Sequence, residues 1–95
     1  MQDFKTININ DLGQLGDVNV IDIREADELS VGAVAGSKHI PMMGLIMNKD
    51  QFLNKNETYY IYCAAGGRSY QTCSLLADAG YNVVNLDGGY SSYRG

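Results

Sequence analysis

The 95-residue sequence has no tryptophan, one proline, one histidine (His39) and only two cysteines, Cys63 and Cys73. Two cysteines are too few for a fold held together by disulfides. One histidine and no C-x-x-C pair leave a structural zinc site without enough soft ligands. We therefore expect neither a metal site nor a cofactor, and the two thiols are the groups to follow.

Basic side chains and long apolar runs are also scarce. Seven Lys and Arg against eleven Asp and Glu give a formal net charge of −4, whereas a protein that binds phosphate backbones needs the opposite sign. The longest mostly apolar stretch, residues 40–47, is far shorter than the about 20 residues that span a bilayer. Residues 1–5 lack the basic-then-apolar order of a secretory signal. These absences predict no nucleic-acid partner, no membrane partner and a cytoplasmic location, where thiols stay free unless chemistry uses them.

The remaining composition is that of a folded chain. Hydrophobic residues make up 45% and charged residues 19%, which is typical of a globular protein rather than a disordered one. Surface scaling predicts that a chain of this size buries roughly two-thirds of its unfolded surface, enough for one core. We expect one domain over residues 1–95, and the composition leaves its oligomeric state open.

Short β-rich runs alternate with short helical runs along the chain. The predicted strands cover residues 18–23, 59–62 and 83–86, with shorter ones at 6–7 and 38–40. The predicted helices run from an Asn10 cap to Leu15, over 26–31, from Pro41 to about 48, and over 69–79 before Gly80. On the last helix, Tyr70, Cys73, Leu76 and Ala77 are spaced to form its apolar face. This alternation predicts an α/β fold with a mostly parallel sheet.

The most informative stretch is Tyr60–Ser69, which reads as a strand, a loop of small residues and a helix start. In such sheets ligands bind beyond the carboxyl ends of the strands, and Cys63 stands at one such end. The following helix directs free N–H groups and a partial positive charge toward the loop. Gly66 and Gly67 can adopt positive φ, which would turn successive amides inward as an anion nest. Both effects favour a thiolate and predict that the pKa of Cys63 lies below about 8.5.

The residues around Cys63 have more than one possible role. Ala64 and Ala65 are small enough to leave the sulfur approachable. Arg68 could contact an anion or brace the loop, because a cation at a helix start is unfavourable for the helix dipole. Ser69 fits an N-cap. Cys73 lies on the apolar helix face, which favours core packing over a resolving thiol, and His39 is interpreted as a strand-end residue rather than a base.

The loop from Cys63 to Ser69, C-A-A-G-G-R-S, resembles the C-x-x-G-x-R-S active-site loop of single-domain rhodanese-like sulfurtransferases. Three further stretches resemble motifs of this family in the same order. They are I-D-I-R-E at 21–25 (D-x-R-E), G-S-K-H-I-P at 36–41 (G-A-x-x-I-P) and L-D-G-G-Y-S-S-Y at 86–93 (L-x-G-G-x-x-x-W).

The resemblance implies a three-layer fold, with a five-stranded parallel sheet and helices on both faces. It also implies a cycle in which the Cys63 thiolate takes a sulfane sulfur from a donor, becomes a persulfide and passes the sulfur to a thiol or cyanide-like acceptor. Gly66, Arg68 and Ser69 match loop positions of the family. Asp22 and Arg24 match a segment that supports the loop or buries an ion pair.

Some positions depart from the family pattern. Residues 31–34 lack the histidine that the family often carries, Tyr93 replaces the closing tryptophan, and Ser37 stands where alanine is usual. Family members that favour thiosulfate tend to have basic residues where this chain has Ala64 and Ala65. We therefore expect weak binding of small dianionic donors, and a protein persulfide or a low-molecular-weight persulfide becomes a plausible donor.

Three other functions stay open. Cysteine phosphatases also hold an oxyanion over a cysteine, but their loop has one residue more between Cys and Arg than the four here, Ala64 to Gly67. Some rhodanese-like domains act as sulfur carriers or interaction modules rather than as enzymes. A Cys63–Cys73 redox switch would require Cys73 to leave its predicted helix face.

Overall fold

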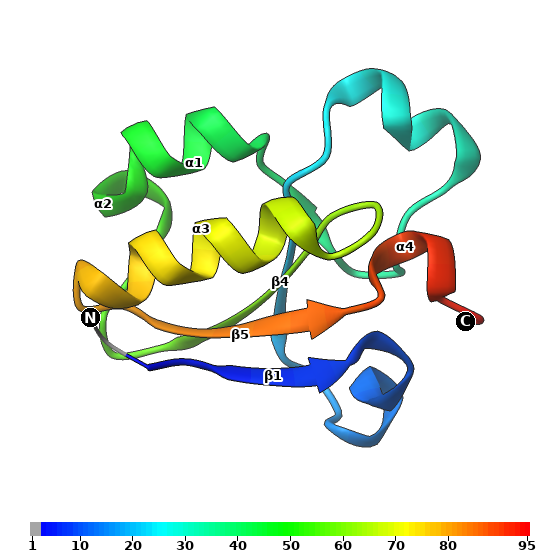
Figure 1. Ribbon diagram of the computed structural model, residues 1–95, viewed down its shortest axis with the longest axis horizontal. Helices are drawn as coiled ribbons and strands as arrows, with labels where there is room; N and C mark the ends of the chain where they lie inside the picture. The colour runs from blue at the N-terminus through cyan, green and yellow to red at the C-terminus, as the bar shows by residue number, and fades with distance from the viewer. Residues whose placement is uncertain (1–2) are drawn as a thin grey trace.

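A five-stranded, fully parallel sheet runs through the middle of the protein in its computed structural model, which describes residues 3–95 (Figure 1). The strand order is β1-β5-β4-β2-β3. Its strands are β1 (Lys5–Asn8), β2 (Asn19–Asp22), β3 (Lys38–His39), β4 (Thr58–Tyr62) and β5 (Asn82–Asp87). The α-helices are α1 (Met42–Met47), α2 (Lys49–Phe52), α3 (Gly67–Asp78) and α4 (Gly89–Ser92), and the 3-10 helices are η1 (Ile9–Gln14) and η2 (Ala26–Val31).

The pleat of β4 divides the interior into two cores. Tyr59 and Ile61 face one side, where they pack with residues of α1 and α3 such as Leu45 and Leu76. Tyr62 faces the other side, in a core that includes residues of η1 and is packed against by Tyr90 of α4. Because side chains alternate along a strand, Cys63 points back to the α3 side and is part of the first core. The expected α/β fold, with a five-stranded parallel sheet covered on both faces, is therefore observed.

The predicted strands are all present, with ends shifted by at most one residue. The helix starts differ more. The first helix is a 3-10 helix capped by Asn8, whose side chain accepts a hydrogen bond from the Asn10 N–H, so the prediction of an Asn10 cap was wrong. The α3 helix begins at Gly67 rather than at Ser69, and Tyr70 is 55% exposed rather than part of the buried face. The short helices α2 and α4 were not predicted, since four residues carry too little periodicity to show.

Within residues 3–95, no helix has both the length and the apolar character needed to cross a membrane.

Candidate active site

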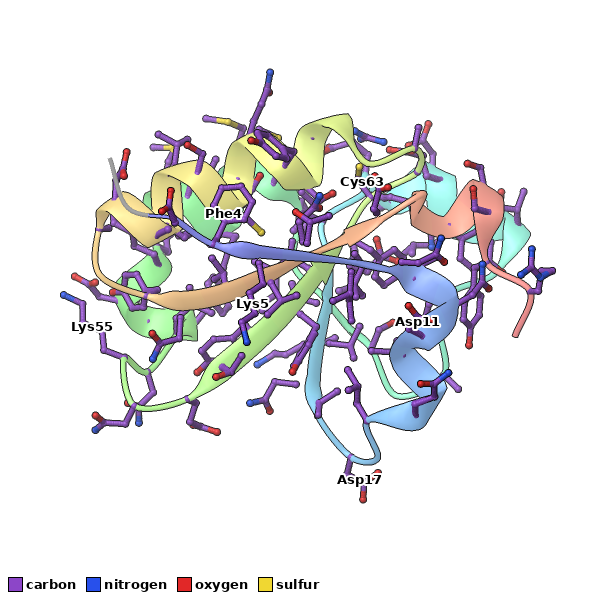
Figure 2. The ribbon with its side chains drawn as sticks, turned by 60° about the horizontal axis from the view of Figure 1, so that its bottom comes forward. Phe4, Lys5, Asp11, Asp17, Lys55 and Cys63 are labelled. Carbon is purple, nitrogen blue, oxygen red and sulfur yellow. The ribbon has the colours of Figure 1, made fainter. Side chains whose placement is uncertain are left out.

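Cys63 follows the last residue of β4, and α3 begins only four positions later in the chain (Figure 2). Its side chain is only 1% exposed. The turn between strand and helix depends on Gly66, which has φ +109° and forms the N-cap of α3. A side chain at that φ would be strained. The sequence therefore places the sulfur directly at the amino end of a 12-residue helix.

Backbone N–H groups surround the Cys63 sulfur. The N–H of Gly66 donates to Sγ at 3.1 Å and the N–H of Ser69 donates at 3.4 Å. The Ser69 hydroxyl oxygen lies 3.6 Å from Sγ. The amide nest expected from the sequence is present, but Gly67 has ordinary helical φ rather than positive φ. The inward turn is made by Gly66 alone.

These contacts shift the ionisation of Cys63. Burial of the sulfur raises the pKa, but hydrogen bonds from the Ser69 hydroxyl and from the N–H groups of Ser69, Gly66 and Ala65 outweigh it. The net pKa of Cys63 lies below the ordinary value for a thiol. The other thiol, Cys73, is fully buried without such donors, and burial together with the nearby Cys63 raises its pKa to about 12. Of the two thiols, Cys63 is therefore the one that ionises at the lower pH.

We expect the rate at which iodoacetamide alkylates Cys63 to rise with pH, and the midpoint pH of this rise to be lower in the native protein than in urea. In urea the thiol should titrate at about 8.5. The folded pKa is the lower one. The stability contributed by this group is therefore complete above the unfolded pKa and is lost as pH falls through the folded pKa. Mass spectrometry of the labelled protein over a pH series measures the midpoint. A Cys73→Ala control should keep it, and a native midpoint at or above the one in urea would contradict the expectation.

Helix α4 fixes the backbone of the loop through two hydrogen bonds. The N–H of Tyr90 donates to the carbonyl of Cys63 at 2.8 Å, and the N–H of Ser91 donates to the carbonyl of Ala64 at 2.9 Å. This close approach needs Gly89, because a Cβ there would lie 2.5 Å from both of these carbonyl oxygens. The carbonyls are thereby turned toward α4, which leaves the amides to face the sulfur.

Ser69 is not the N-cap that the sequence suggested, because it lies inside the first turn of α3. Its fully buried hydroxyl lies 3.1 Å from the carbonyl of Gly66 and 2.6 Å from Oδ1 of Asn85 on β5. Its N–H group, which a free helix start would leave unpaired, is directed at Cys63. Ser69 therefore contributes two groups to the surroundings of the sulfur.

Arg68 is bound by a carboxylate of η2. Its two terminal nitrogens donate to the two oxygens of Glu28, both at 2.8 Å. The guanidinium holds the pKa of Glu28 at about 2, and the carboxylate raises the pKa of Arg68 further. Of the two roles considered for Arg68, the geometry favours support of the loop over contact with an anion, because the guanidinium is already paired with the Glu28 carboxylate.

Asp22 and Arg24 form a buried ion pair beneath η2. The guanidinium of Arg24 contacts both carboxylate oxygens of Asp22, at 2.7 to 3.1 Å. It also donates to the carbonyls of Glu28 and Gly32, and it lies 4.5 Å from the ring centroid of Tyr90. Burial raises the pKa of Asp22, but the bonds from Arg24 outweigh this and hold it below its usual range. The pair reaches the site indirectly, because it holds the segment that carries Glu28.

Sequence reasoning missed four residues of this region: Glu28, Tyr62, Asn85 and Tyr90. Tyr62 donates from its hydroxyl to Asp22, and the same hydroxyl accepts the N–H of Val34. Asn85 gave a usable signal, since it is a polar residue in the middle of the strand V-V-N-L. Glu28 gave none, because nothing in the chain indicates that η2 folds back onto the start of α3. His39 is a strand-end residue, as expected, and its ring nitrogen Nε2 forms a hydrogen bond with the backbone carbonyl of Arg24.

A cavity of about 330 Å³ opens beside the loop. Its lining includes Ala64, Tyr90, Val31, Asp27 and Glu28. Arg24 also lines this cavity, but its charge is matched by Asp22. Approach to Cys63 from this side therefore passes apolar and acidic groups.

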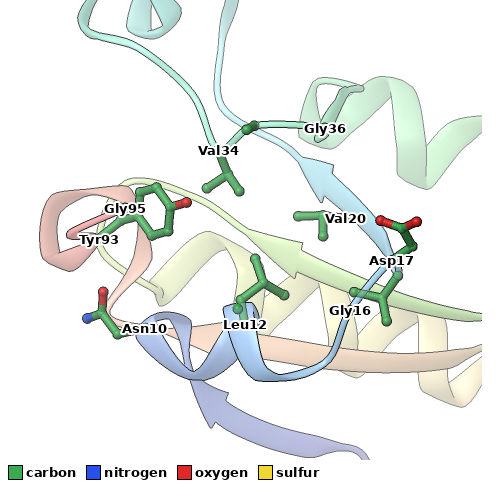
Figure 3. A pocket seen from close by; sticks show the side chains of 12 residues that line it. Asn10, Leu12, Gly16, Asp17, Val20, Val34, Gly36, Tyr93 and Gly95 are labelled. Carbon is green, nitrogen blue, oxygen red and sulfur yellow. The ribbon is translucent and has the colours of Figure 1, made fainter.

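A second cavity, of about 310 Å³, lies between η1 and residues 34–36, on the face of the sheet that carries Tyr62 (Figure 3). Leu12, Val20 and Val34 form its apolar lining, and Asn10 and Tyr93 lie toward the C-terminus. It contains no cysteine or histidine. Within residues 3–95, no group of three or more His, Cys, Asp or Glu side chains is placed to hold a metal ion.

The N–H groups of Gly66 and Ser69 are directed at the sulfur of a cysteine that stands at the carboxyl end of a central parallel strand, and such an arrangement can stabilise a sulfur anion. The model of the rhodanese-like domain family matches residues 8–95. This chain belongs to that family.

Related proteins agree with this assignment. A protein of Allochromatium vinosum named "Sulfurtransferase" is 38% identical over 79 residues, which cover 82% of this chain and 73% of that protein. A protein of Bacillus subtilis named "Putative sulfur carrier protein YrkF" is 30% identical over 82% of this chain and 42% of its own length. The crystal structure of a rhodanese-like domain protein from Staphylococcus aureus superposes with a TM-score of 0.84, at 34% identity, over 94% of this chain and 90% of that one.

Proposed function

We propose that this protein is a sulfurtransferase of the rhodanese type that carries sulfane sulfur on Cys63. The observation that supports it best is the set of donors around the sulfur: N–H groups of Gly66 and Ser69 within 3.4 Å and the Ser69 hydroxyl at 3.6 Å. These groups stabilise the Cys63 thiolate that attacks the donor and that is released again when the sulfur leaves, because dipoles fixed by the fold need no reorganisation when the charge forms.

The reaction has two displacements at sulfur. In the first, the Cys63 thiolate attacks the sulfane sulfur of the donor, the new S–S bond forms, and the donor's old bond breaks. The electron pair leaves on sulfite if the donor is thiosulfate, or on a thiolate if it is a persulfide. In the second, a thiolate or cyanide acceptor attacks the outer sulfur and Cys63 departs as a thiolate, which restores the starting state.

A thiol persulfide, on a protein or a small molecule, suits this site better as donor than thiosulfate does. Thiosulfate carries two negative charges, and the side chains nearest the loop offer no unmatched cation, because Arg68 is paired with Glu28 and Arg24 with Asp22. The cavity beside Ala64 adds the carboxylate of Asp27. A persulfide carries at most one charge at sulfur and can bring apolar groups that match Val31, which is 73% exposed, and Tyr90.

Mass spectrometry of the intact protein tests the proposal. After treatment with a glutathione persulfide donor, Cys63 is expected to gain the mass of one sulfur atom and to lose it again with dithiothreitol or cyanide. Cys63→Ser should abolish the gain, and Cys73→Ser should leave it unchanged. No gain with persulfide or with thiosulfate would refute the proposal. Turnover of an aryl phosphate that depends on Cys63 would instead favour a phosphatase.

Replacing Glu28 with Gln should improve the use of thiosulfate, because it frees the Arg68 charge beside the loop. We expect KM for thiosulfate to fall roughly 3- to 10-fold, which corresponds to about 0.7–1.4 kcal/mol, with a stability loss of at most about 1 kcal/mol. Initial rates over a range of thiosulfate concentrations, repeated at several salt concentrations, measure this change in KM. Asp11→Asn is the matched control, since Asp11 is an exposed carboxylate of η1 that does not line the cavity beside the loop. An equal gain in both variants would show that overall charge, rather than Arg68, decides.

A role as a sulfur carrier is the second candidate, and the name of the Bacillus subtilis relative supports it. A carrier accepts and releases sulfur once per encounter with a partner, whereas an enzyme turns over many equivalents with free donor and acceptor. Counting sulfur transferred per Cys63 distinguishes the two. A Cys63–Cys73 switch is less suited to the site, because the raised pKa of Cys73 keeps its thiol protonated.

The remaining expectations concern the setting of the activity. We propose that residues 1–95 act as one rhodanese-like domain without a metal or cofactor, in the cytoplasm. The partners would be a small sulfur donor or a protein persulfide, together with a thiol or cyanide-like acceptor.

A further inference from the structure

Asn85 is a buried polar residue that the sulfur-transfer steps do not yet use. It lies on β5, is 1% exposed, and pairs in register with Ile61, two residues before Cys63 on the neighbouring strand. The alternation of β5 points it to the same side as Val83, into the core beneath α3. An apolar residue would serve packing better here, because a buried amide needs partners to offset its desolvation.

The partner of Asn85 is the hydroxyl that borders the nucleophile. Three groups that accept or exchange a proton surround Ser69 Oγ: Asn85 Oδ1 at 2.6 Å, the Gly66 carbonyl at 3.1 Å and Cys63 Sγ at 3.6 Å. A serine hydroxyl has one hydrogen and can donate in one direction at a time. The direction of that hydrogen therefore decides whether the Ser69 hydroxyl donates a hydrogen bond to a negatively charged sulfur or to another acceptor.

The two states of Cys63 demand opposite directions. While Cys63 is a thiol, its S–H donates to Ser69 Oγ, and the Ser69 hydroxyl donates a hydrogen bond to the side-chain carbonyl of Asn85. When Cys63 becomes a thiolate, Sγ needs the hydroxyl hydrogen for itself, and Oδ1 of Asn85 then competes for it. Rotating the amide by half a turn replaces Oδ1 with the NH₂ group, which donates to Ser69 Oγ and removes the competition.

We propose that Asn85 is a positioning residue, whose side-chain amide sets the direction of the Ser69 hydroxyl to match the state of the Cys63 sulfur. An amide can do this because it has an acceptor and a donor of nearly the same shape. Aspartate has the shape but only accepts when ionised, and leucine has neither group. The proposal rests on Cys63 being the nucleophile of the proposed function. The charged side chain that acts on Cys63 from α3 is the Arg68 guanidinium, whereas Cys73 on the same helix stays a neutral thiol.

The ionisation of Cys63 gives a readout that a merely structural role would not move, and it needs no sulfur donor. It is followed by the ultraviolet absorbance of the thiolate in wild type, Asn85→Asp, Asn85→Leu, Ser69→Ala and the double variant Asn85→Asp/Ser69→Ala. We expect Asn85→Asp to raise the midpoint by about one unit or more and Asn85→Leu to raise it less. In the Ser69→Ala background, the effect of Asn85→Asp should fall to less than half.

Two outcomes would overturn the proposal: an unchanged midpoint in Asn85→Asp, or an equal shift with and without Ser69, which would reveal direct charge repulsion. Val83→Ala is the control, because it removes packing on the same face of β5 and should lower stability without moving the midpoint. A sulfur-transfer assay that fails while the midpoints behave as expected would count against the proposed function and not against this role of Asn85.

A measurement on the wild-type protein covers the case in which Asn85 variants do not fold. The side-chain amide signals of Asn85 in a ¹⁵N-labelled sample are followed over the titration of Cys63. They should shift with the midpoint of Cys63, and the shift should shrink in Ser69→Ala. Amide signals that ignore the ionisation of Cys63 would contradict the proposal.

Discussion

Replacing Arg24 with Met is expected to destabilise the protein by about 3–5 kcal/mol, the range found when one partner of a buried ion pair is removed. The carboxylate of Asp22, which is 0% exposed, would keep only the Tyr62 hydroxyl and one backbone N–H as donors. The loss is a large part of the 5–15 kcal/mol typical of a domain. Urea unfolding followed by circular dichroism measures it.

The double variant Asp22→Asn/Arg24→Met separates the buried charge from the lost contacts. If the uncompensated carboxylate dominates, neutralising it should restore part of the lost stability. The carbonyls of Glu28 and Gly32 lose their donor in both variants, so η2 should remain loosened. A single variant that loses less than about 1 kcal/mol would mean that water replaces the guanidinium and the pair is not needed for stability.

Replacing Gly89 with Ala is the second change with a large expected effect. The residue has φ +60°, and a Cβ would overlap the backbone of Cys63 and Ala64, which cannot move aside as a side chain could. The conformation costs about 1–2 kcal/mol and the overlap about 1–3 kcal/mol. We expect a stability loss of about 2–5 kcal/mol in total and a displaced loop. The rate of persulfide formation should therefore fall more than the fraction of folded protein.

Two other glycines make the comparison specific. Gly66→Ala has the positive φ without a close neighbour, so it should show the conformational cost alone. Gly13→Ala has open space and ordinary φ, and its stability should stay within about 0.5 kcal/mol of wild type. If Gly89→Ala behaves like Gly13→Ala, the contact between α4 and the loop is loose and does not hold the amides in place.

The order of elements could be predicted from the sequence because each strand and the long helix has its own periodic signal. The strand ends and the position of Cys63 follow from such local patterns. The start of α3 was misplaced because Ser69 is a good cap in isolation, whereas here the core offers its hydroxyl a partner on β5. Tertiary contacts thus decide what a local rule cannot.

The parts of the site that come from one short segment of the chain could be predicted from the sequence. The parts that the fold brings together from distant segments could not. The donors at Gly66 and Ser69 lie in one short loop, so sequence reasoning reached them. Glu28 lies 40 residues from Arg68 in the chain, and only the fold of η2 shows that Arg68 has no free charge. The expectation that thiosulfate binds weakly is strengthened by this pairing, which no sequence pattern indicated.

The matched charges around Cys63 also affect how the site responds to salt. Arg24 and Arg68 are each neutralised within the protein, so the sulfur anion is held mainly by short hydrogen bonds from the backbone and Ser69. Salt at physiological concentration screens exposed charges over about 8 Å but acts little on buried dipoles a few ångströms from their target. The pH at which Cys63 ionises should therefore be nearly the same at low and high ionic strength, and only the approach of a charged partner should change with salt.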